Sequence, residues 1–345
     1  MAHKILVTGG TGYIGSHTVV ELQQAGYETV IIDNLSNSNV GVLDGIEKIT
    51  GKRPVFVEGD CTDIDILRRL FSEYPGIDGI INFAASKAVG ESVKEPLLYY
   101  RNNLCTLLNL LELMPEFGVS GIVFSSSCTV YGEPDRNPID ESAPIKNATS
   151  PYGNTKQISE EIITDFINSG APVKSVILRY FNPIGAHPSA LIGELPNGIP
   201  NNLVPYLTQT AAGIRKELTV FGDDYDTPDG SCIRDYIDVV DLAKAHVMAM
   251  RRMLSSSEDT DRIEIFNLGT GHGLSVLELI SAFESATGVR VPYRIGARRE
   301  GDIEKIWADP AKANNILGWT ASVPVTETMR NAWAWQLRTD SKSNL

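Results

Sequence analysis

The 345-residue sequence is poor in residues that form disulfides or bind metals. Its four cysteines, Cys61, Cys105, Cys128 and Cys232, lie far apart without CxxC spacing, and its five histidines show no HExxH or other paired spacing. Zinc sites and disulfide frameworks of small secreted proteins depend on such spacings. We therefore expect reduced thiols and no bound metal.

Positive charge is scarce as well. With 30 Lys and Arg against 43 Asp and Glu, the formal net charge is −13. The overall field repels nucleic acid and anionic membrane surfaces, so neither is an expected partner, and an anionic ligand would need a local cluster of arginines. The N-terminal apolar run is interrupted by glycines and is too short for a signal-peptide core or a membrane span. We expect a cytoplasmic protein.

Short apolar runs alternate with helical patterns through the first half of the chain. The runs cover residues 4–9, 29–34, 54–60, 79–86, 121–127 and 173–182, and the first helical pattern covers 12–25. This alternation predicts an α/β fold with a Rossmann-like, doubly wound parallel sheet.

After Phe181 the sequence becomes rich in Pro, Gly and Asn and loses its long periodicity, which indicates a change of domain. We expect a nucleotide-binding domain over 1–181 and a smaller mixed α/β substrate domain over 182–337. The region 234–267 is a candidate to cross back to the first domain, and 338–345 is expected to be a frayed tail.

A glycine motif lies between the first apolar run and its helix. Gly10, Gly12 and Gly15 match GxGxxG, a spacing that lets backbone approach a pyrophosphate and places that anion at a helix N-terminus. A lone match is often just a glycine-rich turn. Here the strand and helix on either side are those the mechanism requires, so the motif favours a dinucleotide.

Acidic residues at two strand ends indicate which dinucleotide. Asp33 ends the second apolar run, where a carboxylate can accept hydrogen bonds from the adenosine ribose, and residues 33–39 contain no Arg or Lys for a 2′-phosphate. These features favour NAD over NADP. Asp60, after the third run, is a candidate to meet the adenine. A simple turn or strand-end cap is the structural alternative for both residues.

Tyr152 and Lys156 are the candidate catalytic pair. They stand four apart just after Pro151, where a helix can begin, so both side chains share one face. A lysine ammonium near a phenol stabilises the phenolate, and we expect it to lower the tyrosine pKa towards neutrality and yield a general base. A surface YxxxK is common by chance, but this one follows the fifth apolar run and the polar strand end SSS, residues 125–127, which offers a partner hydroxyl.

Several longer strings carry a family resemblance across nearly the whole chain. They are TGGTGYIGSH, DNLSNS, FAASKAVGES, SSSCTVYG, SPYGNTK, LRYFNPIGAHPS, GIPNNLVPY, RDYIDVVDLA, NLGTG and RREGD followed by WAD. In their number and order the sequence resembles the extended short-chain dehydrogenase/reductases, and most closely those that epimerise UDP-sugars.

The resemblance implies roles for the catalytic residues and a set of cofactor contacts. Tyr152 would be the base, Lys156 its electrostatic partner and nicotinamide-ribose ligand, and Ser127 the hydroxyl bonded to the reacting sugar oxygen. The implied contacts to a tightly bound NAD are Gly9, Gly12, Tyr13, Ile14, Gly15, Asp33, Asn34, Ser36, Asn37, Ser38, Asp60, Cys61, Phe83, Ala84, Lys87, Asn102, Tyr152, Lys156 and Phe181.

The resemblance also implies a UDP-sugar site. Arg234 and Arg299 would hold the diphosphate, Asp302 the uridine ribose, and the remaining residues would surround the sugar and uracil. The full implied set is Lys87, Ser127, Thr129, Tyr152, Asn182, Asn202, Leu203, Phe221, Arg234, Arg299, Asp302 and Ile306. Two guanidiniums at one spot would let an acidic protein hold a dianionic nucleotide sugar.

The implied activity is reversible inversion at C4 of UDP-glucose and UDP-galactose through a 4-keto sugar and transient NADH. One alternative is a nucleotide-sugar 4,6-dehydratase, whose relatives resemble TDEVYG where this chain has SCTVYG, residues 127–132. Cys128 and Thr129 stand in place of the two acidic residues that elimination needs. Another is a 4-epimerase that accepts UDP-N-acetylhexosamines, because Ile306 falls where relatives control the space beside the sugar.

Two further possibilities concern the class of protein and its assembly. A dinucleotide sensor without catalysis could have the same fold but would not need Tyr152 and Lys156. The helical patterns over 97–114 and 152–169 are apolar on more than one face, and related proteins dimerise through such a pair. We therefore expect a homodimer.

Overall fold

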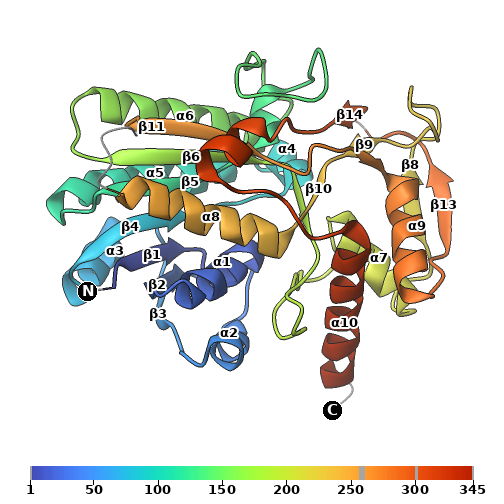
Figure 1. The fold of residues 1–345 in the computed structure, drawn as a ribbon, viewed down its shortest axis with the longest axis horizontal. Helices are drawn as coiled ribbons and strands as arrows, with labels where there is room; N and C mark the ends of the chain where they lie inside the picture. The colour runs from blue at the N-terminus through green and yellow to red at the C-terminus, as the bar shows by residue number, and fades with distance from the viewer. Residues whose placement is uncertain (1, 256–260, 300–301, 344–345) are drawn as a thin grey trace.

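The computed structural model describes residues 2–255, 261–299 and 302–343. In this part of the chain, seven strands form one parallel sheet in the order β11-β6-β5-β4-β1-β2-β3 (Figure 1). The strands are β1 (Lys4–Thr8), β2 (Glu28–Asp33), β3 (Val55–Glu58), β4 (Ile77–Asn82), β5 (Gly121–Ser127), β6 (Lys174–Tyr180) and β11 (Ile263–Leu268). The order reverses between β1 and β4, which confirms the expected doubly wound, Rossmann-like fold.

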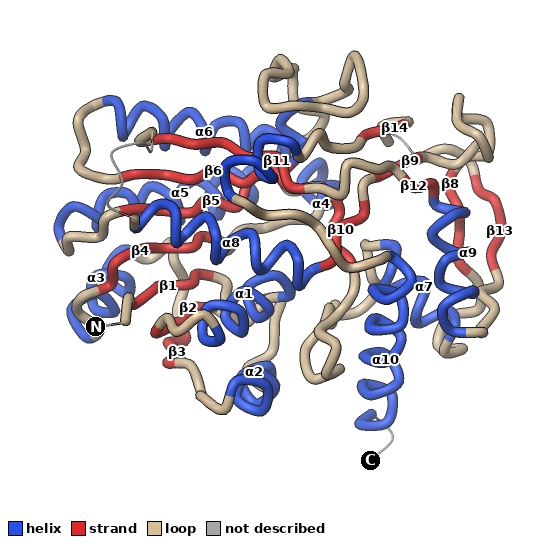
Figure 2. Tube along the Cα trace, in the orientation of Figure 1, coloured by secondary structure: helices blue, strands red, loops and turns tan. Residues whose placement is uncertain are grey.

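Helices cover both faces of this sheet (Figures 1 and 2). Alternation along each strand creates two cores: Ile5 and Val7 face one helix layer, and Leu6 faces the other. The first layer contains α1 (Tyr13–Gln24), α2 (Val42–Thr50) and α8 (Val239–Leu254). The second contains α3 (Ile64–Glu73), α5 (Pro96–Glu116) and α6 (Pro151–Asn168), with the short α4 (Val89–Lys94) beside α6.

The chain leaves the large sheet after β6 and builds a smaller half, seen beside the sheet in Figure 1. There β7 (Asn182–Ile184) pairs with β10 (Tyr236–Asp238), and β9 (Ile233–Arg234) lies between β12 (Leu274–Ser275) and β14 (Lys305–Ile306). A third pair joins β8 (Leu218–Phe221) to β13 (Tyr293–Gly296). The helices here are α7 (Leu203–Ala211), α9 (Val276–Thr287) and α10 (Val325–Ser343), and they share a core with Leu207, Leu279 and Phe283.

Two segments from the second half of the sequence pack with the first half. Helix α8 covers the sheet, and β11 pairs with β6 as its outermost strand. Residues 233–238, by contrast, form β9 and β10 outside the large sheet. The large sheet and the helices that cover it are therefore built from two separate stretches of the chain.

The C-terminal end corrects one expectation. Helix α10 continues to Ser343, so residues 338–343 are helical rather than a frayed tail, and residues 344–345 lie outside the described residues. The helix is anchored upstream, where Trp335 Nε1 donates to the Glu194 carbonyl at 2.9 Å. Because extending a helix that has already formed costs little free energy, the polar residues that follow this anchor can continue it. Across the described ranges, no helix has the length and apolar character needed to cross a membrane.

Candidate active site

The glycine turn between β1 and α1 lies tightly against the end of β4. Gly9 has a φ of +68°, and a Cβ added there would lie 2.8 Å from the Ala84 backbone nitrogen. That nitrogen donates to Thr8 Oγ1 at 3.2 Å. A Cβ at Gly15 would clash with the Gly9 carbonyl oxygen. The turn and residues 83–84, which both contain expected cofactor residues, thus meet at the N-terminus of α1. Only glycine permits packing this close, and a bound pyrophosphate requires such an approach of the backbone.

Asp33 joins this turn to the loop after β2. Its carboxylate accepts hydrogen bonds from Thr11 N at 3.2 Å, Leu35 N at 2.9 Å and Ser38 Oγ at 3.0 Å. The acid therefore lies beside the glycine turn, where the sequence places the adenosine ribose.

Asp60 lies beside the same loop. It accepts from Asn34 Nδ2 at 3.0 Å and from Thr62 N at 2.8 Å. Burial acts to raise the pKa of Asp60, but these hydrogen bonds outweigh it and hold the pKa below its usual value. The Cys61 thiol packs in the core with Leu67, so any cofactor contact from Cys61 would come from its backbone.

The expected catalytic residues converge at the end of β5 and the start of α6. Ser127 ends β5 and caps η1 (Cys128–Tyr131), with its Oγ accepting from Thr129 N at 3.2 Å. Ser150 caps α6, which starts at Pro151 as expected and carries Tyr152 and Lys156. Lys156 Nζ donates to the Ser125 carbonyl at 2.6 Å and lies 5.8 Å from the centre of the Tyr152 ring.

The electrostatics of this cluster correct the expected effect of Lys156 on Tyr152. Burial raises the pKa of the Tyr152 phenol well above its usual value, and hydrogen bonding with Ser127 acts in the opposite direction without overcoming it. Burial also lowers the pKa of Lys156 to about 8. Among the protein's own groups, the loss of water around the phenol therefore outweighs the lowering of the Tyr152 pKa expected from Lys156.

A polar atom near Ser127 suggests room for a ligand. The Thr129 hydroxyl is buried and has no hydrogen-bond partner among the described residues. Buried polar groups are normally satisfied, so an unpaired hydroxyl two residues from Ser127 fits a site that contributes this group to a bound molecule.

The two expected diphosphate arginines lie around one carboxylate. Arg299 Nη2 and Nε donate to Asp302 at 2.6 and 3.1 Å, and Arg234 Nη2 lies 3.7 Å from Asp302 Oδ1. The Arg299 guanidinium also lies 5.7 Å from the centre of the Phe221 ring. Phe221, Arg234 and the Arg299–Asp302 pair come from three separate stretches of the sequence, yet they form a cluster of local positive charge in an acidic protein.

Ile306 lies beside this cluster because its strand, β14, pairs with β9, the strand that carries Arg234. In the pairing of β9 with β14, Ile306 lies opposite Arg234. Its side chain is 3% exposed and packs in an apolar group with Phe181 and Val130. Asn182, the first residue after Phe181, donates its backbone N–H to the Asp235 carbonyl at 2.9 Å. The residues expected beside the sugar thus approach the end of β5.

One functional candidate was missed from sequence. Glu194 Oε1 accepts from Asn202 Nδ2 at 2.6 Å and lies 3.7 Å from Lys87 Nζ, so it joins an expected substrate residue to an expected cofactor residue. A lone acid in the Pro-, Gly- and Asn-rich segment after Phe181 was the available signal. Asn102 donates to Ser86 Oγ at 2.8 Å and ties the loop before Lys87 to α5. Leu203 begins α7 beside Asn202.

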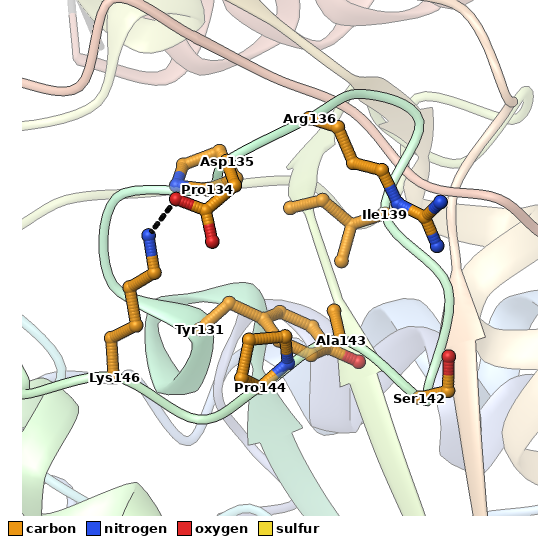
Figure 3. A pocket seen from close by; sticks show the side chains of 9 residues that line it. All are labelled: Tyr131, Pro134, Asp135, Arg136, Ile139, Ser142, Ala143, Pro144 and Lys146. Atoms are coloured by element: carbon orange, nitrogen blue, oxygen red, sulfur yellow. Dashed lines mark hydrogen bonds and ion pairs between the residues drawn. The ribbon is translucent and has the colours of Figure 1, made fainter.

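A separate small pocket lies beneath the loop after η1. Figure 3 shows its lining side chains, which enclose about 180 Å³ and include Tyr131 and Ile139, with the ion pair Lys146–Asp135 at its rim. None of its lining residues belongs to the expected cofactor or sugar sites. Within the described ranges, no cluster of His, Cys, Asp or Glu is arranged to hold a metal ion.

Comparison with known proteins identifies the relatives of this arrangement. The UDP-glucose 4-epimerase of Neisseria meningitidis serogroup B is 51% identical over 332 residues, which cover 96% of this chain and 96% of that protein. The human UDP-glucose 4-epimerase is 49% identical over 347 residues, covering 99% and 98%. This chain belongs to the UDP-glucose 4-epimerase family. It is thereby an extended short-chain dehydrogenase/reductase, as the sequence strings implied.

Structural comparison agrees with this family. The crystal structure of UDP-glucose-4-epimerase from Stenotrophomonas maltophila, with bound NAD and formylated UDP-arabinopyranose, superposes with a TM-score of 0.94 at 50% identity and covers 99% of both chains. The enzyme from Bifidobacterium longum, in complex with NAD+ and UDP, gives a TM-score of 0.93 at 46% identity, covering 98% of this chain and 99% of that one. Residues 6–332 also match a family model described as GDP-mannose 4,6 dehydratase.

The glycine turn provides a test of the cofactor site in this family member. In Gly15→Ala the added methyl must displace the Gly9 carbonyl, so we expect NAD affinity to fall by about tenfold or more, equivalent to about 1.4 kcal/mol. Gly90→Ala is the matched control, because a Cβ there meets no atom within 4 Å. Both purified variants would be titrated with NAD by calorimetry after the resident nucleotide is removed. Equal affinities would contradict the assignment of the turn.

Proposed function

We propose that this protein catalyses the reversible C4 epimerisation of UDP-glucose and UDP-galactose with a tightly bound NAD. The observation that carries the proposal is the convergence of Ser127, Tyr152 and Lys156 at the end of β5, on the same carboxyl edge of the parallel sheet as the glycine turn after β1. The arginine cluster around Asp302 supplies the anchor for a diphosphate. A sensor without catalysis would need neither the Tyr–Lys pair nor the sugar-side asparagines.

The residues supply binding, orientation and proton transfer. Arg234 and Arg299 hold the diphosphate while the sugar reaches the end of β5, where the Ser127 hydroxyl meets its 4-oxygen. Tyr152 accepts the proton from that oxygen and returns it when C4 has been inverted. A bound NAD would supply the acceptor and donor of hydride for C4, and the positive charge of its oxidised ring would favour ionisation of the buried Tyr152 phenol.

The reaction leaves the cofactor unchanged, which explains why tight binding is useful. Between oxidation and reduction the sugar must present its other face, so the anchor must hold the UDP moiety while the ring turns. The position of Arg234 opposite Ile306 links that anchor to the wall beside the sugar.

Elimination of water is a poorer fit, although the matching family model bears the name of a dehydratase. A 4,6-dehydratase needs an acid and a base where this chain has Cys128 and Thr129. Burial raises the pKa of the Cys128 thiol to about 12, and the Thr129 alcohol is weaker still as an acid. Neither group can expel a hydroxyl at neutral pH.

The main test uses UDP-galactose with purified protein and no added NAD. We expect UDP-glucose to form, and Tyr152→Phe to slow turnover by roughly 10²–10⁴-fold because proton transfer is lost. Tyr293→Phe, at an exposed tyrosine of β13, is the matched control and should keep its rate. Product is measured by anion-exchange chromatography.

The outcomes of this test separate the alternatives. Absence of UDP-glucose from a protein shown to carry NAD would exclude the epimerase, whereas a 4-keto-6-deoxy product would indicate a dehydratase. Near-normal turnover by Tyr152→Phe would remove Tyr152 from the role of base.

Substrate breadth depends on Ile306. The side chain is branched, buried and packed against Phe181, so we propose a preference for sugars without an N-acetyl group. We expect kcat/KM for UDP-galactose to exceed that for UDP-N-acetylgalactosamine by about 10-fold or more, and Ile306→Ala to narrow the ratio. Ile303→Ala, which trims a neighbour in the same apolar group, is the control. A wild-type ratio near one would contradict the preference.

We also propose a homodimer formed through α5 and α6. These helices pack together in the second layer, and α5 exposes Leu97, Leu98 and Leu108. Light scattering at micromolar concentration should give the mass of two chains, and Leu108→Arg should shift it towards one. Leu337→Arg, at an exposed position of α10, is the control and should leave the dimer intact. A wild-type monomer would refute the proposal.

A cytoplasmic location and the two functional domains complete the proposal. Cys61, Cys105, Cys128 and Cys232 are free thiols, which suits a reducing compartment. The first domain would bind NAD and the second the UDP-sugar, with α8 and β11 returning to the first.

A further inference from the structure

A buried ion pair lies directly behind the candidate catalytic strand. Arg179 of β6 donates to Glu160 of α6 through Nη2 at 2.6 Å and Nε at 3.0 Å, and the two side chains are 5% and 10% exposed. The Ser126 hydroxyl donates to Glu160 Oε1 at 2.5 Å. Two charges removed from water are tolerated when their hydrogen bonds are satisfied in this bidentate way. The Glu160 carboxylate therefore ties together β5, β6 and α6.

This carboxylate lies among the catalytic residues in both sequence and space. Glu160 stands one helical turn after Lys156 on α6, a spacing that places both on one face. Ser126 stands between Ser125, whose carbonyl accepts from Lys156 Nζ, and Ser127. A single acid thus fixes α6 against β5 at the place where each of them carries a candidate catalytic group.

The Glu160 carboxylate also favours the charged form of Lys156. Burial lowers the Lys156 pKa to about 8, and the Coulombic attraction of Glu160 acts against this lowering. Other titratable or charged groups among the described residues around this face are Tyr152 on α6, Arg179 and Tyr180 on β6, Tyr99 on α5, Glu91 on α4, and Cys128 and Tyr131 on η1, where the Tyr131 hydroxyl accepts from Arg179 Nη1 at 3.0 Å. Glu91 is engaged by the Tyr99 hydroxyl at 2.6 Å, and Arg179 is engaged by Glu160.

We propose that Glu160 is a positioning residue for the epimerase reaction: held by Arg179 and Ser126, it locks α6 to β5 and keeps the Lys156 ammonium charged. The inference rests on the proposed function, because it assigns a role to Lys156 in that reaction. A residue that only fills the packed interior would affect the stability of the protein but not the ionisation of Lys156, whereas a positioning residue would affect both.

Glu160→Gln tests this role, because it preserves the shape of the side chain and removes its charge. Without the carboxylate, Lys156 loses its proton at lower pH, so the alkaline limb of the kcat profile should move down by on the order of one pH unit. We expect kcat at pH 8 to fall by about fivefold, as the charged fraction of Lys156 falls, while KM for UDP-galactose changes little, because the diphosphate anchor is untouched. The pH profile, the thermal midpoint and the bound NAD content would be measured for each variant.

Two further variants make the result decisive. Glu161→Gln, the exposed neighbour on α6, should leave the pH profile unchanged. The double variant Glu160→Gln/Arg179→Met removes the unpaired guanidinium, so it should regain thermal stability relative to Glu160→Gln and also retain a lowered alkaline limb. If Glu160→Gln does not fold, the double variant alone provides the comparison.

Each outcome has one meaning. A wild-type pH profile in a folded Glu160→Gln, or recovery of both stability and profile in the double variant, would overturn the proposal and leave Glu160 a packing residue. A wild-type protein that does not convert UDP-galactose would instead refute the proposed function, so the two failures can be told apart.

Discussion

The ammonium group of Lys156 is buried at the edge of a parallel sheet, and a charge deprived of water must be compensated by the protein around it. The Ser125 carbonyl accepts one of its hydrogens, and the carboxylate of Glu160 lies one turn further along α6. This constraint fixes the end of β5 and the start of α6 relative to each other. The positions of Ser127 and Tyr152 follow from it, because they belong to the same two elements.

In the smaller half of the protein, too, charged side chains are held in place by groups of opposite charge. A net charge of −13 offers nothing to a nucleotide sugar at long range, yet Arg234 and Arg299 lie around a single carboxylate, Asp302. The acid holds the guanidiniums in place at low electrostatic cost, and a diphosphate can then bind to charges that are already arranged. Glu194 has a comparable position between Lys87 and Asn202.

The chemistry that distinguishes this chain within its wider family lies in a few residues on a shared fold. The family model matched over residues 6–332 is described as a dehydratase, whereas relatives about half identical to the chain are UDP-glucose 4-epimerases. Ser127 ends β5, and Cys128 and Thr129 follow it in η1, at the proposed site of the reaction. Without an acid at the last two positions, oxidation at C4 is supported and elimination is not.

The sequence by itself determined the alternation of strands and helices in the first half of the chain, the glycine turn, and the spacing of Tyr152 and Lys156. Each of these depends on local periodicity or on neighbours within one helical turn. Only the tertiary structure decided which distant residues meet. The pairing of Arg179 with Glu160, the arginines around Asp302 and the link from Glu194 to Lys87 all join segments from different elements. It also decided how deeply Tyr152 is buried, and among the protein's own groups this burial outweighs the local effect of a lysine four residues away on the pKa of the phenol.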